Sequence, residues 1–172
     1  MNQVAVVSAF VGGVASSLRA DALANVDLQA RLAALDDDAL VEAVRDDAAL
    51  AYCLPDARYT RELSLEIVAL NGSYLKAIPA AVRALPDFEH DAALAAMWAF
   101  GYVSEASKTK ELLLDVIREV DFDVAMFGES WAVPIAIMTP DVIHALKAKC
   151  AASEWRTAQL QRYLEKRALG AP

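Results

Sequence analysis

An internal repeat constrains the fold of this chain more than any other feature of its sequence. Residues 37–55 align without a gap on residues 61–79, about 24 positions further along the chain. A third copy starts at Lys110, and a looser copy starts at His90. Such a period is typical of repeat proteins, whose small units bury a continuous core by stacking on their neighbours.

Each copy follows the same pattern. It begins with acidic residues, continues as an apolar stretch of helical periodicity and, after a polar or glycine break, ends in a second short apolar helix. Thr60 and Thr109 each precede a first-turn carboxylate and are predicted helix N-caps. Gly72 and Gly101 suit left-handed helix C-caps. We therefore expect helix–turn–helix hairpins, which must stack because one hairpin cannot bury its own apolar face.

One copy shows the pattern most clearly and reads L-x-x-E-I-V-A-L-N-G-S-Y-L-K over residues 63–76. It resembles an uncharacterised family of tandem helical repeats whose pattern is D-x-E-x-V-x-x-A-V-x-x-N-G-x-x-L. The resemblance covers residues 36–128, although the first and last copies lack the Asn-Gly pair. It implies a helical-repeat fold, and it implies no activity and no site residues.

The predicted fold class is all-α: a short α-solenoid-like stack of helix–turn–helix hairpins with a C-terminal capping helix pair. We expect a single domain over residues 1–172. Its expected parts are N-terminal helices in 1–35, four helical-hairpin repeats in 36–128, and a connector with the C-terminal capping helices in 129–172.

The two C-terminal helices have clear boundaries in the sequence. Thr139 followed by Pro140 predicts a helix start, and this helix is expected to end near Cys150. Ser153 is the predicted N-cap of the last helix. The expected apolar stripe of that helix consists of Trp155, Leu160, Tyr163, Leu164 and Leu169.

Residues 123–132 read DVAMFGESWA and suggest an alternative, because a strand followed by Gly-Glu-Ser could present Ser130 as the nucleophile of an α/β-hydrolase. The repeat alignment instead places residues 122–127 on the second helix of a hairpin. The hydrolase turn also needs a glycine where this chain has Ala132, and a parallel sheet that this chain is too short to supply. We therefore expect no catalytic residues and no enzyme activity.

Charge is distributed unevenly along the chain. The formal net charge is −8, but residues 1–138 carry 10 basic and 21 acidic side chains, net −11, whereas residues 139–172 are net +3. This balance argues against the broad basic surface that direct nucleic-acid binding requires. It suits a protein partner with a basic surface, or a homodimer in which opposite charges meet.

Composition narrows the class of protein further. The hydrophobic fraction is 57%, but no apolar run approaches the roughly 20 residues that span a bilayer, so no membrane insertion is expected. The opening VAVVSAFVGGVASS is interpreted as a first helix rather than a signal segment, because no Lys or Arg precedes it. Cys53 and Cys150 are expected to be buried reduced thiols, which favours a cytoplasmic location. Two histidines, His90 and His144, are too few for a histidine-based metal site, and no metal or cofactor is expected.

Two rows of acidic side chains recur at equivalent positions of the repeats and are the predicted partner-binding residues. Arg45 and Arg118 are expected to compensate the second row in two copies, because each follows its carboxylate by three residues. The rows are therefore either solvated helix faces or an acidic ridge that meets a partner. The first row is Asp38, Glu62, Asp91 and Glu111; the second, one turn later, is Glu42, Glu66 and Asp115.

These features lead to three functional hypotheses. The first is a non-catalytic protein-interaction module, since stacked hairpins form a continuous groove. The alternative is an acidic inhibitor that mimics nucleic acid and occupies the basic channel of a partner, as an anti-defence protein of a mobile element would. The third is an enzyme or ligand carrier with an apolar pocket between helices. Trp98, Phe100 and Tyr102 lack interleaved Lys or Arg, so core packing is predicted for them rather than base stacking.

Overall fold

The computed structural model describes residues 21–96, 98–120 and 133–168. Within these residues every regular element is a helix and no strand occurs, so the predicted all-α fold class is confirmed. The α-helices are α3 (Val26–Ala34), α4 (Asp37–Asp46), α5 (Arg61–Leu70), α6 (Ala80–Arg83), α7 (Phe88–Ala95), α8 (Lys110–Glu119), α9 (Pro140–Cys150) and α10 (Glu154–Ala168). The 3-10 helices are η1 (Ala48–Tyr52), η2 (Asp56–Arg58), η3 (Gly72–Lys76), η4 (Ala99–Tyr102) and η6 (Ile135–Ile137).

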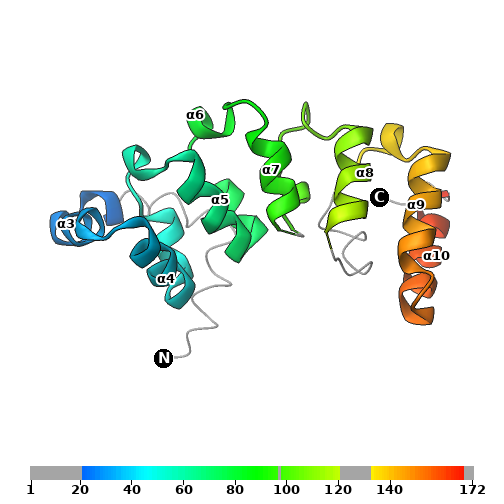
Figure 1. Ribbon diagram of the computed structural model, residues 1–172, viewed down its shortest axis with the longest axis horizontal. Coiled ribbons are helices and arrows are strands. Elements are labelled where there is room, and N and C mark those ends of the chain that lie inside the picture. The colour runs from blue at the N-terminus through cyan, green and yellow to red at the C-terminus, as the bar shows by residue number, and fades with distance from the viewer. Residues whose placement is uncertain (1–20, 97, 121–132, 169–172) are drawn as a thin grey trace.

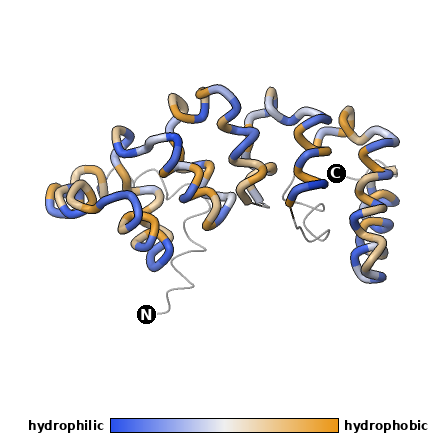
Figure 2. The backbone as a smooth tube through the Cα atoms, viewed as in Figure 1, coloured by the Kyte–Doolittle hydropathy of each residue, from blue (hydrophilic) through white to orange (hydrophobic). Residues whose placement is uncertain are grey.

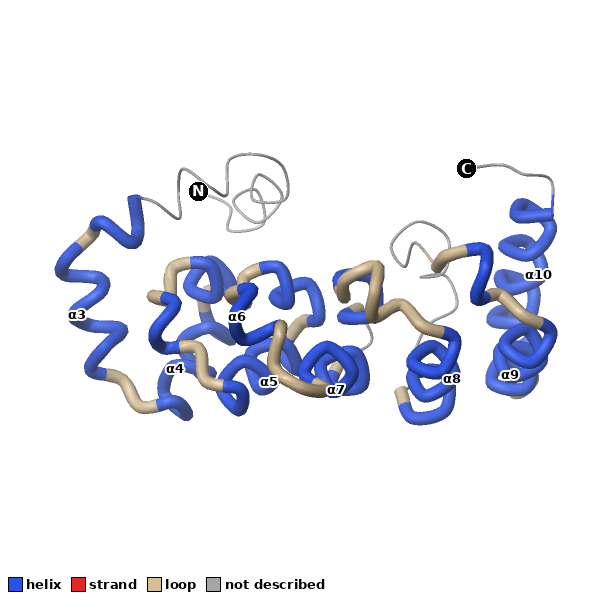
Figure 3. Tube along the Cα trace, turned by 90° about the horizontal axis from the view of Figure 1, so that it is seen from above, coloured by secondary structure: helices blue, strands red, loops and turns tan. Residues whose placement is uncertain are grey.

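The long helices pack in chain order. The contacting pairs are α4 with α5, α5 with α7, α7 with α8, α8 with α9, and α9 with α10. In Figure 1 these helices stand side by side along the long axis of the molecule, from α3 at one end to α10 at the other. Seen from above, α4, α5, α7, α8 and α9 lie along one side and α6 lies on the other (Figure 3).

The core is an apolar stripe that each long helix contributes at helical spacing. In α5 the buried apolar residues are Leu63, Ile67 and Val68. Apolar and polar residues alternate around each helix, as amphipathic helices require (Figure 2). Burial of one such side chain stabilises the fold by roughly 1.5–3 kcal/mol. In α8 the equivalent stripe is Leu112, Leu113, Val116 and Ile117.

The second helix of each described hairpin is a short 3-10 helix. α4 is followed by η1, α5 by η3 and α7 by η4. The residue directly after each α-helix, Asp47, Asn71 or Ala96, has extended backbone. The Asp47 side chain accepts a hydrogen bond from the amide of Ala49 (3.0 Å), and Asn71 accepts one from Ser73 (2.9 Å). These Asx side chains satisfy amides at the start of η1 and η3, where the backbone has no helical partner.

The predicted left-handed C-caps at Gly72 and Gly101 are wrong. Both glycines lie inside 3-10 helices, and α5 and α7 end instead on Asn71 and Ala96 with extended backbone. Gly72 is required for a different reason, because a Cβ atom there would lie 2.2 Å from the backbone nitrogen of Ala99. The glycine therefore permits a close approach of two backbones where η3 packs on η4.

The helix of the looser copy begins before His90, where the alignment started that copy. α7 starts at Phe88, after Asp87, whose backbone is left-handed (φ 57°) and whose side chain does not cap the helix. Phe88 and Glu89 are both buried. The buried face of α7 therefore begins at Phe88, before His90, where this copy was expected to start.

The predicted C-terminal helix pair is present. α9 runs from Pro140 to Cys150 after Thr139, as expected. Ser153 caps α10, since its Oγ accepts a hydrogen bond from the amide of Arg156 (3.3 Å). α10 packs against α9, which in turn packs against α8.

The apolar stripe of α10 differs from the prediction at one residue. Leu160 is buried, and Tyr163 and Leu164 pack against the core. Trp155 is 51% exposed. It lies five residues before Leu160 and is therefore rotated by about 140° around the helix from the buried stripe. The expected core position of Trp155 is wrong.

The aromatic residues in and next to η4 also differ in burial. Phe100 is fully buried, which confirms its predicted core position, whereas Trp98 is 37% exposed. Tyr102 is half-buried, and the Nζ atom of Lys76 lies 4.3 Å from the centre of its ring. Core packing therefore holds for Phe100 but not for Trp98.

Some predictions fall on residues outside those described. They concern the helix in the opening segment, the second helix of the last hairpin at 122–127, the loop at Ser130, and Leu169. Among the described helices, none is both long and apolar enough to cross a membrane.

Candidate functional site

The first predicted acidic row lies at the helix starts, as the sequence indicated. Asp38, Glu62, Asp91 and Glu111 stand in the first turns of α4, α5, α7 and α8, respectively. The partial positive charge of a helix N-terminus stabilises a carboxylate there. Asp91 is half-buried, whereas the other three are exposed. We call Asp38, Glu62 and Glu111 the acidic edge.

Ion pairs join the N-terminal ends of neighbouring helices. Arg61, the first residue of α5, pairs with Asp91 in the first turn of α7. Lys110, the first residue of α8, pairs with Asp141 in the first turn of α9, with 3.1 Å between Nζ and Oδ2. Because both pairs connect first turns, these helices start along a common side of the molecule, as Figure 1 shows. The acidic edge therefore extends across several helices.

The second predicted row is largely compensated within the fold. Arg45 pairs with Glu42, and Nη2 of Arg118 lies 2.9 Å from Oδ1 of Asp115. Both pairs have the predicted three-residue spacing, which confirms that prediction. Glu66 is exposed on α5. The predicted residues thus follow the row of helices rather than meeting in one cluster.

His90 brings two of the predicted carboxylates together. Its Nε2 lies 3.3 Å from Oδ2 of Asp115 on α8, and its Nδ1 lies 3.5 Å from Oδ1 of Asp91. The hydrogen bond with Asp115 and the nearby Asp91 raise the pKa of His90, against the smaller opposing effect of burial. Asp91 also pairs with Arg61, and Asp115 with Arg118, so this chain of charges connects α5, α7 and α8.

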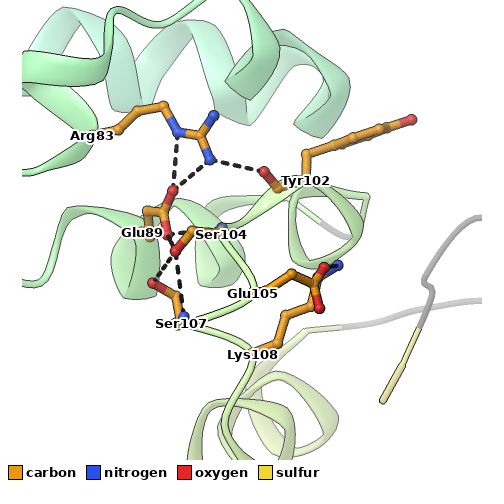
Figure 4. A network of polar contacts seen from close by, with 7 residues as sticks. All are labelled: Arg83, Glu89, Tyr102, Ser104, Glu105, Ser107 and Lys108. Atoms are coloured by element: carbon orange, nitrogen blue, oxygen red, sulfur yellow. Dashed lines mark hydrogen bonds and ion pairs between the residues drawn. The ribbon is translucent and has the colours of Figure 1, made fainter.

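A buried carboxylate, Glu89, organises the turn that precedes α8 (Figure 4). Its Oε1 accepts hydrogen bonds from the Arg83 guanidinium, with 2.9 Å from Nε. Its Oε2 accepts from the amide (2.9 Å) and hydroxyl (2.6 Å) of Ser104. Arg83 also donates to the carbonyl oxygen of Tyr102 (3.0 Å). α6, α7 and the segment after η4 are thereby held together.

The hydrogen bonds decide the charge state of Glu89. Burial alone would raise the pKa of this carboxyl. Hydrogen bonds from Ser104, Ser107 and Arg83 outweigh that effect and lower the pKa below its ordinary value. Glu89 is therefore an ionised group whose charge is matched by Arg83.

Sequence reasoning missed both His90 and Glu89 as organising residues. The partners of His90 and Glu89 on other elements, Asp115 and Ser104, lie 25 and 15 residues away in the chain, so no local spacing indicates these contacts. The one available signal was the presence of a lone histidine between acidic residues at 89–91.

A groove of about 840 Å³ lies between α6–α7 and α8. Its apolar lining includes the buried Phe88 and Leu112 together with the exposed Leu85. Its charged lining includes both members of the Arg83–Glu89 pair. The remaining ionisable residues that line it are Asp87, His90, Glu111 and Asp115.

The thiols are placed as predicted. Cys53 and Cys150 are both buried, and burial raises the pKa of the Cys150 thiol. A buried thiol of raised pKa is a poor nucleophile, because the thiolate is the reactive form. Across the described part of the chain, no group of three or more His, Cys, Asp and Glu side chains is arranged to hold a metal ion.

Comparisons with known proteins add no family to this picture. No family model matches the chain, and neither curated proteins nor solved structures give a match. What the chain does must therefore be inferred from its own geometry and charge.

Proposed function

We propose that this chain is a non-catalytic protein-interaction module, built as a short α-solenoid-like stack of helical hairpins with α9 and α10 as its C-terminal cap. Two observations support the architecture. Successive helices pack in chain order, and α4, α5 and α7 are each followed by a 3-10 helix. Stacks of this kind present long continuous surfaces to their partners.

The acidic edge is the observation that carries the proposal. Asp38, Glu62 and Glu111 occupy equivalent first-turn positions on three helices and are all exposed. Asp91, the remaining member of the first predicted row, pairs with Arg61 and joins α7 to α5. The acidic edge thus offers negative charge that the fold itself does not use for packing.

The partner that fits this edge is a protein with a basic surface. Residues 1–138 are net −11, so the attraction is long-ranged and accelerates encounter with a basic partner. Such binding weakens with added salt, because the Debye length falls from about 10 Å at 0.1 M to about 3 Å at 1 M.

Affinity purification from the native host, followed by mass spectrometry at low and high salt, tests the proposal. The bait variant Asp38→Asn/Glu62→Gln/Glu111→Gln neutralises the acidic edge and should lose the partner that wild type retains at low salt. The control variant Asp46→Asn/Glu119→Gln/Glu165→Gln removes the same charge from exposed residues elsewhere and should retain it. Equal capture by both variants would contradict the proposal.

The same net charge favours a second candidate, an acidic inhibitor that mimics nucleic acid and occupies a basic channel. The two candidates differ in competition. The nucleic acid that the partner binds specifically should displace it from a mimic more effectively than an unrelated nucleic acid of the same length. Both should act alike on any other basic partner, because each is a polyanion. A partner that is a nucleic-acid-binding enzyme, displaced by its own substrate, would select the second candidate.

A further inference from the structure

The groove between α6–α7 and α8 contains carboxylates of two kinds. Glu89 forms an ion pair with Arg83. Asp115 forms one with Arg118 and is also contacted by His90. Asp87 and Glu111, which are exposed, form no ion pair or side-chain hydrogen bond within the described residues. The groove therefore presents two uncompensated negative charges.

The groove also presents apolar surface beside these charges. The exposed apolar lining residues are Ala80, Ala84 and Leu85, and the buried Phe88 and Leu112 lie beneath the surface of the groove. Asp87 directly precedes Phe88, and Glu111 directly precedes Leu112. Each uncompensated carboxylate is thus adjacent in the chain to an apolar lining residue.

We propose that this groove binds an arginine side chain of the partner protein. Arginine combines an apolar stem with a planar cation, so it can cover the exposed Ala84 and Leu85 while its guanidinium pairs with Asp87 or Glu111. Its fork of N–H donors suits a carboxylate better than the compact ammonium of lysine does. The groove, at about 840 Å³, is much larger than a bare ion needs and has room for several residues of an extended peptide.

This inference rests on the proposed function and specifies how the basic partner is recognised. Asp38 and Glu62 of the acidic edge supply general attraction, and the groove supplies the specific contact. Charge alone would not distinguish arginine from lysine, whereas a groove with carboxylates beside apolar surface does.

The test uses fluorescence anisotropy of a fluorescein-labelled tetra-arginine peptide, with tetra-lysine as the comparison. Asp87→Asn and Glu111→Gln should each weaken tetra-arginine binding by roughly tenfold, the loss expected for one hydrogen bond to a charged group. The matched control is Asp27→Asn, which removes one charge from an exposed first-turn position on α3, outside the groove and outside the acidic edge. It should weaken binding less than twofold, roughly the effect of a screened surface charge.

Two further variants keep the test independent of folding and of net charge. Asparagine tolerates the left-handed backbone of Asp87, so Asp87→Asn preserves the turn. Ala84→Trp fills the groove at an exposed lining residue without changing charge, and should weaken tetra-arginine binding as strongly as Glu111→Gln.

The outcomes separate the inference from the proposed function. If Asp27→Asn weakens binding of the peptide as much as Glu111→Gln does, or if tetra-lysine binds as tightly as tetra-arginine, the groove is not the recognition site, and the edge variant alone then tests the proposed function. If wild type fails to bind tetra-arginine while the host partner is still lost from the edge variant, the inference is overturned and the proposed function stands.

Discussion

A Cβ atom on Gly72 would lie 2.2 Å from the backbone nitrogen of Ala99, which no neighbouring side chain could relieve by moving. The contact joins η3 to η4 and so connects the unit of α5 to the unit of α7. Gly72→Ala should therefore lower the free energy of unfolding by roughly 1–3 kcal/mol, as overpacking does. Urea denaturation followed by circular dichroism measures this loss.

Gly101→Ala is the control for Gly72→Ala, because Gly101 is the glycine of the other 3-10 helix at this contact. An equal loss in both variants would assign the effect to the flexibility of glycine rather than to close approach. A Gly72→Ala protein as stable as wild type would show that η3 and η4 do not pack as described.

The N-cap threonines give a second prediction. Thr60 and Thr109 each accept a hydrogen bond from the amide three residues later, both at 3.1 Å, whereas the Thr139 hydroxyl makes no such bond and donates to Asp141 instead. Thr60→Ala and Thr109→Ala should each cost about 1 kcal/mol of stability. Thr139→Ala should cost less, although all three threonines look alike in sequence. Thermal unfolding of the three variants checks this order, and a Thr139→Ala loss as large as the others would contradict it.

The features that could be predicted from this sequence are those that residues close together in the chain determine. The N-caps at Thr60, Thr109 and Ser153 and the pairs Glu42–Arg45 and Asp115–Arg118 all involve residues within three positions of each other. The starts of α5, α8, α9 and α10 and the first-turn carboxylates were correct for the same reason, whereas the start of α7 was not. The acidic edge, as a set of residues, was therefore predictable.

What could not be predicted depends on how the helices pack. The 2.2 Å approach of Gly72 to Ala99 and the contact of His90 with Asp115 join separate units, and no spacing rule indicates them. Asp91 is not available to a partner, because it pairs with Arg61, thirty residues away at the start of another helix. The groove likewise exists only because α6, α7 and α8 come together.

The buried carboxylate gives a third prediction. Glu89→Gln keeps the shape of the side chain but leaves the Arg83 guanidinium without a matching charge. The amide has only one acceptor oxygen, so it cannot accept from both Arg83 and Ser104 as the two carboxylate oxygens do. The variant should lose roughly 1–3 kcal/mol of stability. Glu66→Gln is the matched control, because Glu66 is exposed on α5 and makes no ion pair or side-chain hydrogen bond among the described residues.

The pH dependence of the Glu89 effect follows from the sign of its pKa shift. The pKa is lowered in the folded protein, so the contribution of Glu89 is present above its ordinary value of 4.5 and is lost as pH falls through the lowered pKa. The difference in unfolding free energy between wild type and Glu89→Gln should therefore shrink in acid. A difference that stays constant down to about pH 2, well below ordinary carboxyl pKa values, would contradict the assignment of an ionised Glu89.

The contact between α7 and α8 gives the last prediction. The pKa of His90 is raised above 6.5 in the folded protein, chiefly by the hydrogen bond with Asp115 and further by Asp91. A raised pKa means that the protonated form stabilises the fold, so this contribution is complete below about pH 6.5 and is lost as pH rises through the raised pKa. Asp115→Asn should lower the pKa of His90, measured from the imidazole resonances by NMR, and Asp91→Asn should lower it less. Equal shifts in both variants, or none, would show that His90 does not join α7 to α8.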